Sequence, residues 1–336
     1  MFKTFDIGLI IAAFTIAFML GMAFIPYIIN FSKKRNLFDA PNIRKIHKIK
    51  ISRLGGIGIF ISFTISFIIF SFLFQFDPQL LYLAASVIIL FITGVVDDVK
   101  NIKANVKFII QIVAAFILVY GGFRLETLFG FFGIFELPIV IQYILSIIII
   151  VGVTNAFNLI DGIDGLAGGV GLVNFLSLGI IFLYLNNVSY ALISFAIAGS
   201  ILAFLFYNFN PARIFMGDAG SLVLGFMMVA LGLFVIKNSN EAFSSLSISN
   251  PHILIGGILL VPVIDTIRVM SQRILRKQSP FIADQNHFHH ILLKRGFSHK
   301  EIVLIIAGSN VLVILVSLMI KDITLNSSVL SLFLVW

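Results

Sequence analysis

The chain has 336 residues and a net charge of +8, and 60% of its residues are hydrophobic while 11% are charged, against about 25% charged residues in soluble domains. This composition excludes a water-soluble globular protein, because repeated apolar runs of about twenty residues have no place in one. The absence of cysteine excludes disulfides, a thiolate nucleophile and thiolate metal sites. In a membrane protein the surplus of basic residues indicates the orientation of the loops and contact with anionic lipid or phosphate groups, rather than nucleic-acid binding.

Ten apolar stretches follow one another, each about long enough to cross a hydrocarbon core of roughly 30 Å as a helix. They lie at 7–31, 54–75, 80–97, 107–123, 138–157, 166–185, 188–208, 218–236, 253–275 and 302–320. The first is too long for a signal-peptide core and is expected to be retained. The short apolar tail at 323–336 is expected to form either a short eleventh span, which we favour, or an interfacial segment. The prediction is therefore an all-α, polytopic transmembrane helical bundle of 10–11 spans, forming one domain over 1–336.

The connections between these stretches differ in charge and in pattern. Residues 124–138, RLETLFGFFGIFELP, alternate large apolar residues with glycine and predict a small external hairpin at the membrane surface. With the amino terminus outside, the inner loops hold 19 Lys and Arg residues and the outer loops hold 4. Because basic residues concentrate on the cytoplasmic side, this split predicts a multi-pass membrane protein with its polar loops facing the cytoplasm. The expected location is the cell inner (plasma) membrane.

The first polar motif ends the third stretch, where Asp97 and Asp98 are followed by Lys103 and Lys107. Two adjacent carboxylates at a membrane boundary are costly without a cation or water beside them. A role in magnesium or phosphate handling is therefore one interpretation, and two solvated acids that end a helix are the other.

The second motif is NAFNLIDGIDGLAGG, in which Asn155, Asn158, Asp161 and Asp164 recur every third residue. That spacing keeps successive side chains close on a helix, and the interspersed glycines let the backbone turn or approach a ligand. Packing glycines and capping acids would also explain the residue types, but not four periodic polar groups. This motif is the more specific signal of a functional site.

Two further motifs follow. Asp218 begins the eighth stretch beside glycines, where it is either an ordinary helix cap or an oxygen ligand for a hard cation. The long inner loop after the ninth stretch carries His287, His289 and His290. Without cysteine and with basic neighbours, this tract suits hydrogen bonding to phosphate or sugar as naturally as zinc binding.

These four motifs, in this order, resemble the polyprenyl-phosphate N-acetylhexosamine-1-phosphate transferase family, and most closely its undecaprenyl-phosphate N-acetylglucosamine-1-phosphate branch. The resemblance extends from about Asn36 to Lys300. The first inner loop, LFDAPNIRKIHKIKISRLGGIGIF, also fits, with Asp39, Pro41, Arg44, Lys45, His47, Arg53, Gly55 and Gly56 in place. Lys50 and Ser52 stand where the family often has proline.

The resemblance implies transfer of N-acetylhexosamine-1-phosphate from a UDP-sugar to undecaprenyl phosphate, with release of UMP, as the first membrane step of cell-envelope polysaccharide synthesis. The residue roles that it implies fall into three groups. The catalytic group is Asp97, Asp98, Lys107 and His289; the substrate-binding group is Asn155, Asp161, Asp164, Arg53, His287 and His290; and Asn158 and Asp218 are the ligands of Mg2+, which Mn2+ could replace.

Two rival functions make different demands on the sequence. The phospho-MurNAc-pentapeptide transferase branch typically has an uninterrupted histidine triplet, whereas this chain reads HFHH. A secondary transporter would place its acids near the bilayer midplane and show paired halves, whereas these acids gather at one face. The expected partners are undecaprenyl phosphate, a UDP-N-acetylhexosamine, the membrane and, as a homodimer, a second copy of the chain; no nucleic acid is expected.

Overall fold

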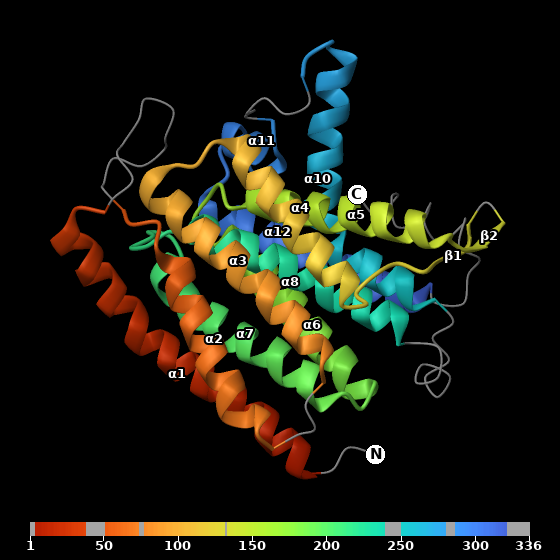
Figure 1. The fold of residues 1–336 in the computed structure, drawn as a ribbon. Coiled ribbons are helices and arrows are strands. Elements are labelled where there is room, and N and C mark those ends of the chain that lie inside the picture. The colour runs from red at the N-terminus through yellow and green to blue at the C-terminus, as the bar shows by residue number, and fades with distance from the viewer. Residues whose placement is uncertain are drawn as a thin grey trace.

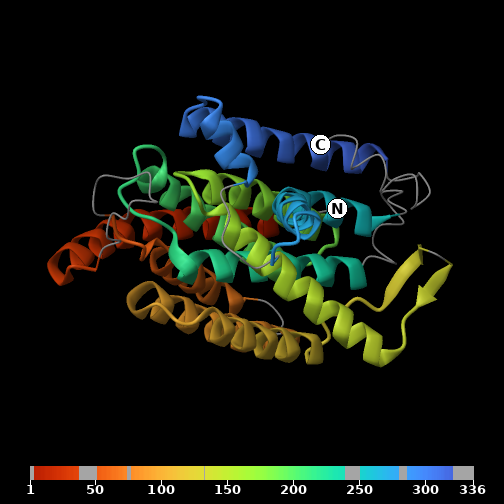
Figure 2. The same ribbon diagram turned by 90° about the horizontal axis from the view of Figure 1, so that it is seen from above.

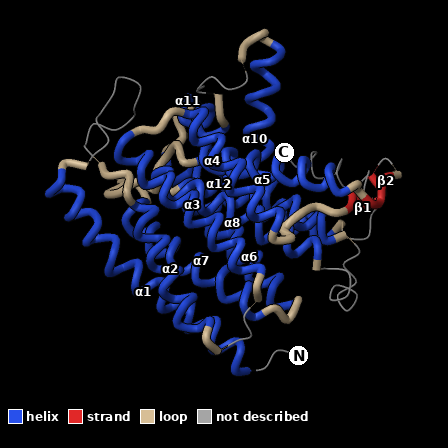
Figure 3. Tube along the Cα trace, in the orientation of Figure 1, coloured by secondary structure: helices blue, strands red, loops and turns tan. Residues whose placement is uncertain are grey.

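The computed structural model describes residues 4–37, 51–73, 77–131, 133–238, 250–279 and 286–320. Helices make up most of these residues, and two strands lie at one edge (Figure 3). The long helices are α1 (Thr4–Arg35), α2 (Gly55–Ser71), α3 (Gln79–Lys100), α4 (Ala104–Tyr120), α5 (Ile139–Ile160), α6 (Leu166–Tyr184), α7 (Val188–Asn208), α8 (Gly217–Lys237), α10 (Pro251–Leu275) and α12 (His299–Met319). The short helix α11 (Phe288–Lys294) precedes α12. Each of the ten predicted stretches thus forms a helix.

The lengths of these helices suit a membrane. Eight of them are long and apolar enough to cross one, and α2 and α4 are apolar helices of 17 residues each. At 1.5 Å per residue, such a helix covers about 26 Å, a little less than a typical hydrocarbon core. The prediction of an all-α polytopic bundle is confirmed, and the predicted eleventh span at 323–336 lies outside the described residues.

Helix α8 forms the centre of the bundle. It is apolar on every face, as expected of a helix enclosed by protein, and its residues from Ala219 to Val235 are all buried. It packs against α5, α3 and α2, while α1 lies along α7 and α2 at one side of the molecule (Figures 1 and 2). The N-terminus of α8 therefore brings Asp218 to the middle of one end of the bundle.

The predicted hairpin is present. Strands β1 (Thr127–Phe131) and β2 (Ile134–Glu136) pair antiparallel and project from the edge of the bundle (Figure 1). Glu126, just before β1, accepts ion pairs from Arg124 at 3.3 Å and from Lys237 of α8 at 3.6 Å. These contacts hold the hairpin at the C-terminal end of α8, opposite Asp218.

Candidate active site

The centre of the site is a lysine that holds two carboxylates. Lys107, in the first turn of α4, places Nζ 3.1 Å from Asp97 Oδ2 and 2.6 Å from Asp218 Oδ2. Asp97 comes from the last turn of α3 and Asp218 from the first turn of α8. All three side chains are partly shielded, with 13–23% of each exposed. One positive and two negative charges leave a local surplus of negative charge, which attracts a cation.

An asparagine from α5 completes this group. Asn158 Nδ2 donates to Asp218 Oδ1 at 3.2 Å and to the hydroxyl of Ser221 at 2.7 Å. Ser221 Oγ in turn donates to the Gly217 carbonyl at 3.0 Å. Helices α3, α4, α5 and α8 therefore bring Asp97, Lys107, Asn158 and Asp218 together, and we call these four residues the Asp97–Asp218 cluster.

Asp98, the neighbour of Asp97, contacts the backbone at the start of α8 and not Lys107. Its carboxylate accepts hydrogen bonds from the backbone N–H groups of Asp218 at 2.8 Å and Ala219 at 3.0 Å. Those groups belong to the first turn of α8 and would otherwise lack partners, so Asp98 caps α8 from another helix. Gly217 allows this approach, since its φ is +71° and a Cβ there would lie 2.6 Å from the Asp98 carboxylate. Asp98 thus orients Asp218 instead of joining Lys107.

Asp161 lies in the turn after α5, close to the same helix start. It accepts a backbone hydrogen bond from Gly217, and burial raises the pKa of Asp161 to about 7, with the Asp218 carboxylate adding to the rise. The Arg53 guanidinium acts in the opposite direction. The structure therefore brings Asp161 and Arg53, both predicted to bind substrate, to the edge of the Asp97–Asp218 cluster.

Asn155, one turn before Asn158, does not face the cluster. Its Nδ2 donates to the Gln111 side chain and to the Val151 carbonyl, and Gln111 is 3% exposed. Gln111 lies one turn after Lys107 on α4. The Asn155–Gln111 pair therefore joins α5 to α4 and fixes the position of Lys107 relative to Asn158 along the two helices. Asn155 supports the site and does not line it.

Asp164 also points into protein. Its carboxylate is 4% exposed, accepts from the Ala212 backbone N–H at 3.1 Å and lies 3.6 Å from His299 Nδ1. The next residue, Gly165, donates its N–H to Asn208 Oδ1 at 2.8 Å. These contacts fasten the α5–α6 turn to the segment before α8 and to α12. The structure does not bring Asp164 to the cluster.

The histidine motif is anchored by an aspartate that the sequence prediction missed. Asp265, 3% exposed in α10, accepts from Arg268 at 2.9 Å and from the Phe288 backbone N–H at 3.0 Å, and it contacts His287 Nδ1 at 3.0 Å. An acid inside an apolar stretch is costly unless it is paired, and this was a usable signal. His287 therefore serves to hold α11 against α10.

His289 meets the α5–α6 turn. The side chain is 2% exposed, and its Nε2 has no hydrogen-bond partner among the described residues. Burial, with His290 adding to the effect, lowers the pKa of His289 to about 3, so the ring is neutral at pH 7. A Cβ on Gly162 would overlap this ring, so only glycine permits the contact. His290, half-buried, lies beside His289 with ring centroids 4.2 Å apart.

The Gly162 contact predicts a stability change that can be measured without knowing the function. Gly162→Ala is expected to lower the free energy of unfolding by about 1–3 kcal/mol, because the added methyl overpacks the His289 ring. In a His289→Ala background the same change should cost almost nothing. Thermal unfolding of the four proteins in detergent tests this. Gly152→Ala, where a Cβ meets open space, is the control, and an equal loss there would contradict the prediction.

The cluster suits a magnesium ion in the type of its donors. Asp97, Asp218 and Ser221 offer oxygen, and Asn158 offers its amide oxygen once the side-chain amide is turned over. Within the described ranges no three acidic or histidine side chains surround one point. Mg2+ is commonly held by one or two carboxylates together with water and substrate phosphates, so this sparse donor set fits it.

Known proteins are similar to this chain over most of its length. The profile of glycosyl transferase family 4 matches residues 80–236, from α3 to α8. A Bacillus subtilis protein named a probable undecaprenyl-phosphate N-acetylglucosaminyl 1-phosphate transferase is 33% identical over 88% of this chain and 81% of its own. Proteins named undecaprenyl-phosphate alpha-N-acetylglucosaminyl 1-phosphate transferase from Escherichia coli and Yersinia pestis are each 29% identical, over 82% and 86% of this chain and 74% and 78% of their own. The chain belongs to glycosyl transferase family 4.

Proposed function

We propose that this chain transfers N-acetylglucosamine-1-phosphate from its UDP derivative to undecaprenyl phosphate and releases UMP. It is a membrane phosphotransferase. The observation that carries this proposal is that Lys107 contacts both Asp97 and Asp218 beside Asn158. The chain is also similar, over 88% of its length, to a protein named for this transfer. A lysine bridging two acids at the mouth of an apolar bundle suits two phosphate-bearing substrates.

The reaction makes one bond and breaks another. An oxygen of the lipid phosphate attacks the β-phosphorus of the UDP-sugar, and the bond from that phosphorus to the bridging oxygen breaks. The leaving UMP takes the electron pair. Little covalent chemistry falls to the protein, so catalysis consists of positioning the reactants and neutralising the developing charge.

Each residue of the cluster has a task in this reaction. Asp97 orients the lipid phosphate and takes up its proton if it arrives protonated, while Lys107 holds Asp97 and binds the diphosphate of the donor. Asp98 and Gly217 fix the start of α8, so that Asp218 keeps its direction. Asp161 and Arg53 contact the nucleotide. Half-buried His290 covers the sugar and phosphates, and neutral His289 beside it packs on the α5–α6 turn.

Asn158 and Asp218 would hold the magnesium ion, which supplies positive charge to the phosphate oxygens when it is bound. A requirement for a divalent cation follows, because two anionic substrates must meet beside two carboxylates. Excess chelator is expected to abolish turnover, and added Mg2+ or Mn2+ should restore it. Full turnover in chelator, measured after removal of bound metal, would contradict the metal assignment.

The activity is tested directly by incubating the purified protein with undecaprenyl phosphate and a panel of UDP-sugars. Chromatography should show UMP, with UDP-N-acetylglucosamine as the best donor. The named relatives favour this donor over UDP-MurNAc-pentapeptide, the substrate of the rival branch. Release of UDP instead would indicate transfer of the sugar without its phosphate and would overturn the proposal.

The proposal also requires the cluster to face the cytoplasm, where UDP-sugars are made. A cysteine replacing exposed Lys300, near the cluster end of α12, should react with an impermeant maleimide only after cells are opened. A cysteine replacing exposed Glu136 in β2 should react in intact cells whose outer envelope admits the reagent. The chain has no native cysteine to confuse the result. The reverse pattern would contradict this orientation, and the homodimer stays a prediction.

A further inference from the structure

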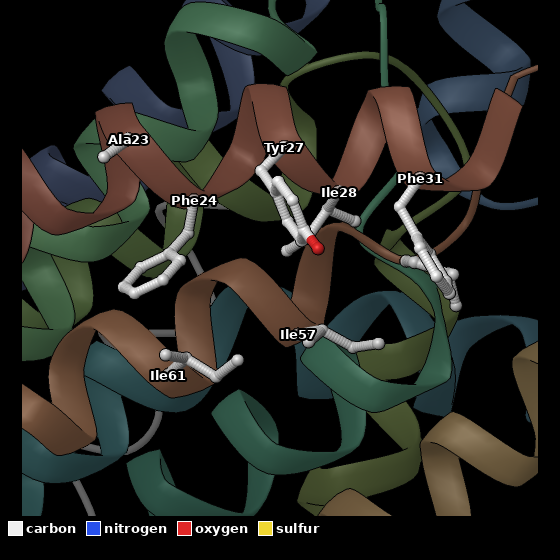
Figure 4. Close-up of a pocket in the computed structure, with 8 residues that line it drawn as sticks. Ala23, Phe24, Tyr27, Ile28, Phe31, Ile57 and Ile61 are labelled. Carbon is white, nitrogen blue, oxygen red and sulfur yellow. The ribbon is translucent and has the colours of Figure 1, made fainter. Parts of the chain in front are cut away.

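A groove runs between α1 and α2 on the outer side of the bundle. Its volume is about 550 Å3, and its lining is apolar apart from the Tyr27 hydroxyl (Figure 4). From α1 it is lined by Phe24, Tyr27 and Phe31, among others, and from α2 by Ile57 and Ile61. Tyr27 is 69% and Phe31 43% exposed, so the groove is open to whatever surrounds the bundle, which in a membrane is lipid.

The stripe of α1 that lines this groove ends in positive charge. Phe24, Tyr27 and Phe31 follow one another at helical spacing of three or four residues, and the next positions on that face are Lys34 and Arg35. Both basic side chains are exposed in the last turn of α1. Basic residues are common at helix C-termini, but here they continue an apolar groove along one helix face. An apolar channel with a cationic end matches an anionic lipid.

We propose that the α1–α2 groove binds one anionic phospholipid, with an acyl chain along Phe24, Tyr27 and Ile57 and the headgroup phosphate at Lys34 and Arg35. The apolar lining provides the contact for the chain, and the two cations provide the preference for an anionic headgroup.

The occupant is a phospholipid and not the lipid that reacts. Helix α1 packs on α7 and α2, whereas Lys107 belongs to α4, which packs on α3 and α5. Helix α2 lies between α1 and α3 (Figure 1), and Phe60 of α2 stacks on Phe91 of α3 with ring centroids 3.8 Å apart. A phosphate held by Lys34 and Arg35 would be on the wrong side of α2 to attack a donor bound at the Asp97–Asp218 cluster.

Hydrogen bonds join the end of α1 beside the groove to the segment before α8. Ser52 Oγ donates to Ser32 Oγ in the last turn of α1 at 2.9 Å, and the Ser52 carbonyl accepts from the Phe215 N–H at 2.7 Å. Gly55 N–H donates to the Phe215 carbonyl at 2.9 Å, two residues before Gly217. A lipid seated in the groove packs on Phe31 and Leu54, which are next to Ser32 and Gly55 in the chain.

The test is lipid binding measured by native mass spectrometry on detergent-purified, lipid-stripped protein. Phosphatidylglycerol should bind at least about tenfold more tightly than phosphatidylcholine with the same acyl chains, because two basic residues meet its charge. Lys34→Gln with Arg35→Gln should bring that ratio close to one. Arg276→Gln with Lys277→Gln, an exposed basic pair at the end of α10, is the matched control and should leave the ratio unchanged.

A second variant tests the groove itself. Ile57→Trp fills it and should weaken binding of both phospholipids, whereas the charge variant affects only phosphatidylglycerol. Three results would overturn the proposal: a ratio unchanged by loss of Lys34 and Arg35, an equal fall in the control pair, or displacement of phosphatidylglycerol by lower concentrations of undecaprenyl phosphate. The last would make the groove a site for the acceptor. None of these measurements needs turnover, so they stand apart from the transferase assay.

Discussion

Asp218→Asn is expected to lower the turnover number at least about a hundredfold, the scale of losing one electrostatic contributor in a polar site. Asp218 contacts both Lys107, at 2.6 Å, and Asn158, at 3.2 Å. The amide keeps the shape but removes the charge that would hold a divalent cation. Steady-state transfer of labelled sugar phosphate into lipid, measured with wild type and variant at equal amounts of folded protein, checks this.

The dependence on metal concentration sharpens this prediction. If Asp218 holds the cation, the Asp218→Asn variant should need far more Mg2+ for half-maximal rate, so that raising Mg2+ recovers part of the activity. Ser221→Ala, which removes a neutral hydroxyl beside Asn158, is the neighbouring control and should cost much less. A variant that kept nearly the wild-type rate would show that Asp218 is not a metal ligand of the reaction.

Asp97→Asn is expected to cost a similar factor, at least about a hundredfold, for a different reason. Asp97 faces Lys107 at 3.1 Å and is placed to orient the acceptor phosphate, so the amide loses both the base and the ion pair. The fold should tolerate the change, because Asp97 is partly exposed and an amide can still accept from the Ile102 N–H. The prediction is a fall in kcat with little change in Tm.

Asp98→Asn provides the matched comparison, since it makes the same chemical change one residue away. The two carboxylate oxygens of Asp98 each accept a hydrogen bond from a backbone N–H group of α8. An asparagine side chain has one acceptor oxygen, so one of these two hydrogen bonds is lost. Leaving a buried donor unpaired costs about 1–3 kcal/mol, so this variant should lower Tm. Equal falls in Tm for the two variants would contradict the separate roles given to these neighbours.

Much of the fold was predictable because a membrane demands long apolar helices. Every predicted stretch became a helix, and the limits of α7 agree to the residue, at Val188 and Asn208. The hairpin at 124–138 was also found. Two of the ten helices, α2 and α4, are shorter than a typical membrane span. Hydropathy alone did not indicate this, because the apolar sequence continues beyond the ends of both helices.

The residues of the site were predictable from the sequence. Which of them face Lys107 and which pack elsewhere was not. Periodicity placed Asn155, Asn158, Asp161 and Asp164 together, yet only tertiary contacts decide which of them faces Lys107. Asn155 donates a hydrogen bond to Gln111 on α4, and Asp164 accepts one from the backbone N–H of Ala212. These partners lie 44 and 48 residues away, beyond what local spacing reports.

The histidine motif shows the same limit in another form. Three histidines in one loop suggested phosphate or sugar contact, whereas His287 is committed to Asp265 and His289 to Gly162. Asp265 could have been noticed as an acid within an apolar stretch. Residues 38–50, which hold Asp39, Arg44, Lys45 and His47, lie outside the described residues, so their expected part in the site stays a prediction.

In the proposed reaction the phosphate moves with the sugar, and one double-labelled donor tests this. UDP-N-acetylglucosamine carrying 32P in its β-phosphate and 3H in its sugar is incubated with the purified protein and undecaprenyl phosphate. Both labels should enter the organic phase in equal molar amounts, together with one equivalent of unlabelled UMP in the aqueous phase. If 3H enters the lipid while 32P stays in the aqueous phase as UDP, or if neither label enters, the phosphotransferase account is wrong.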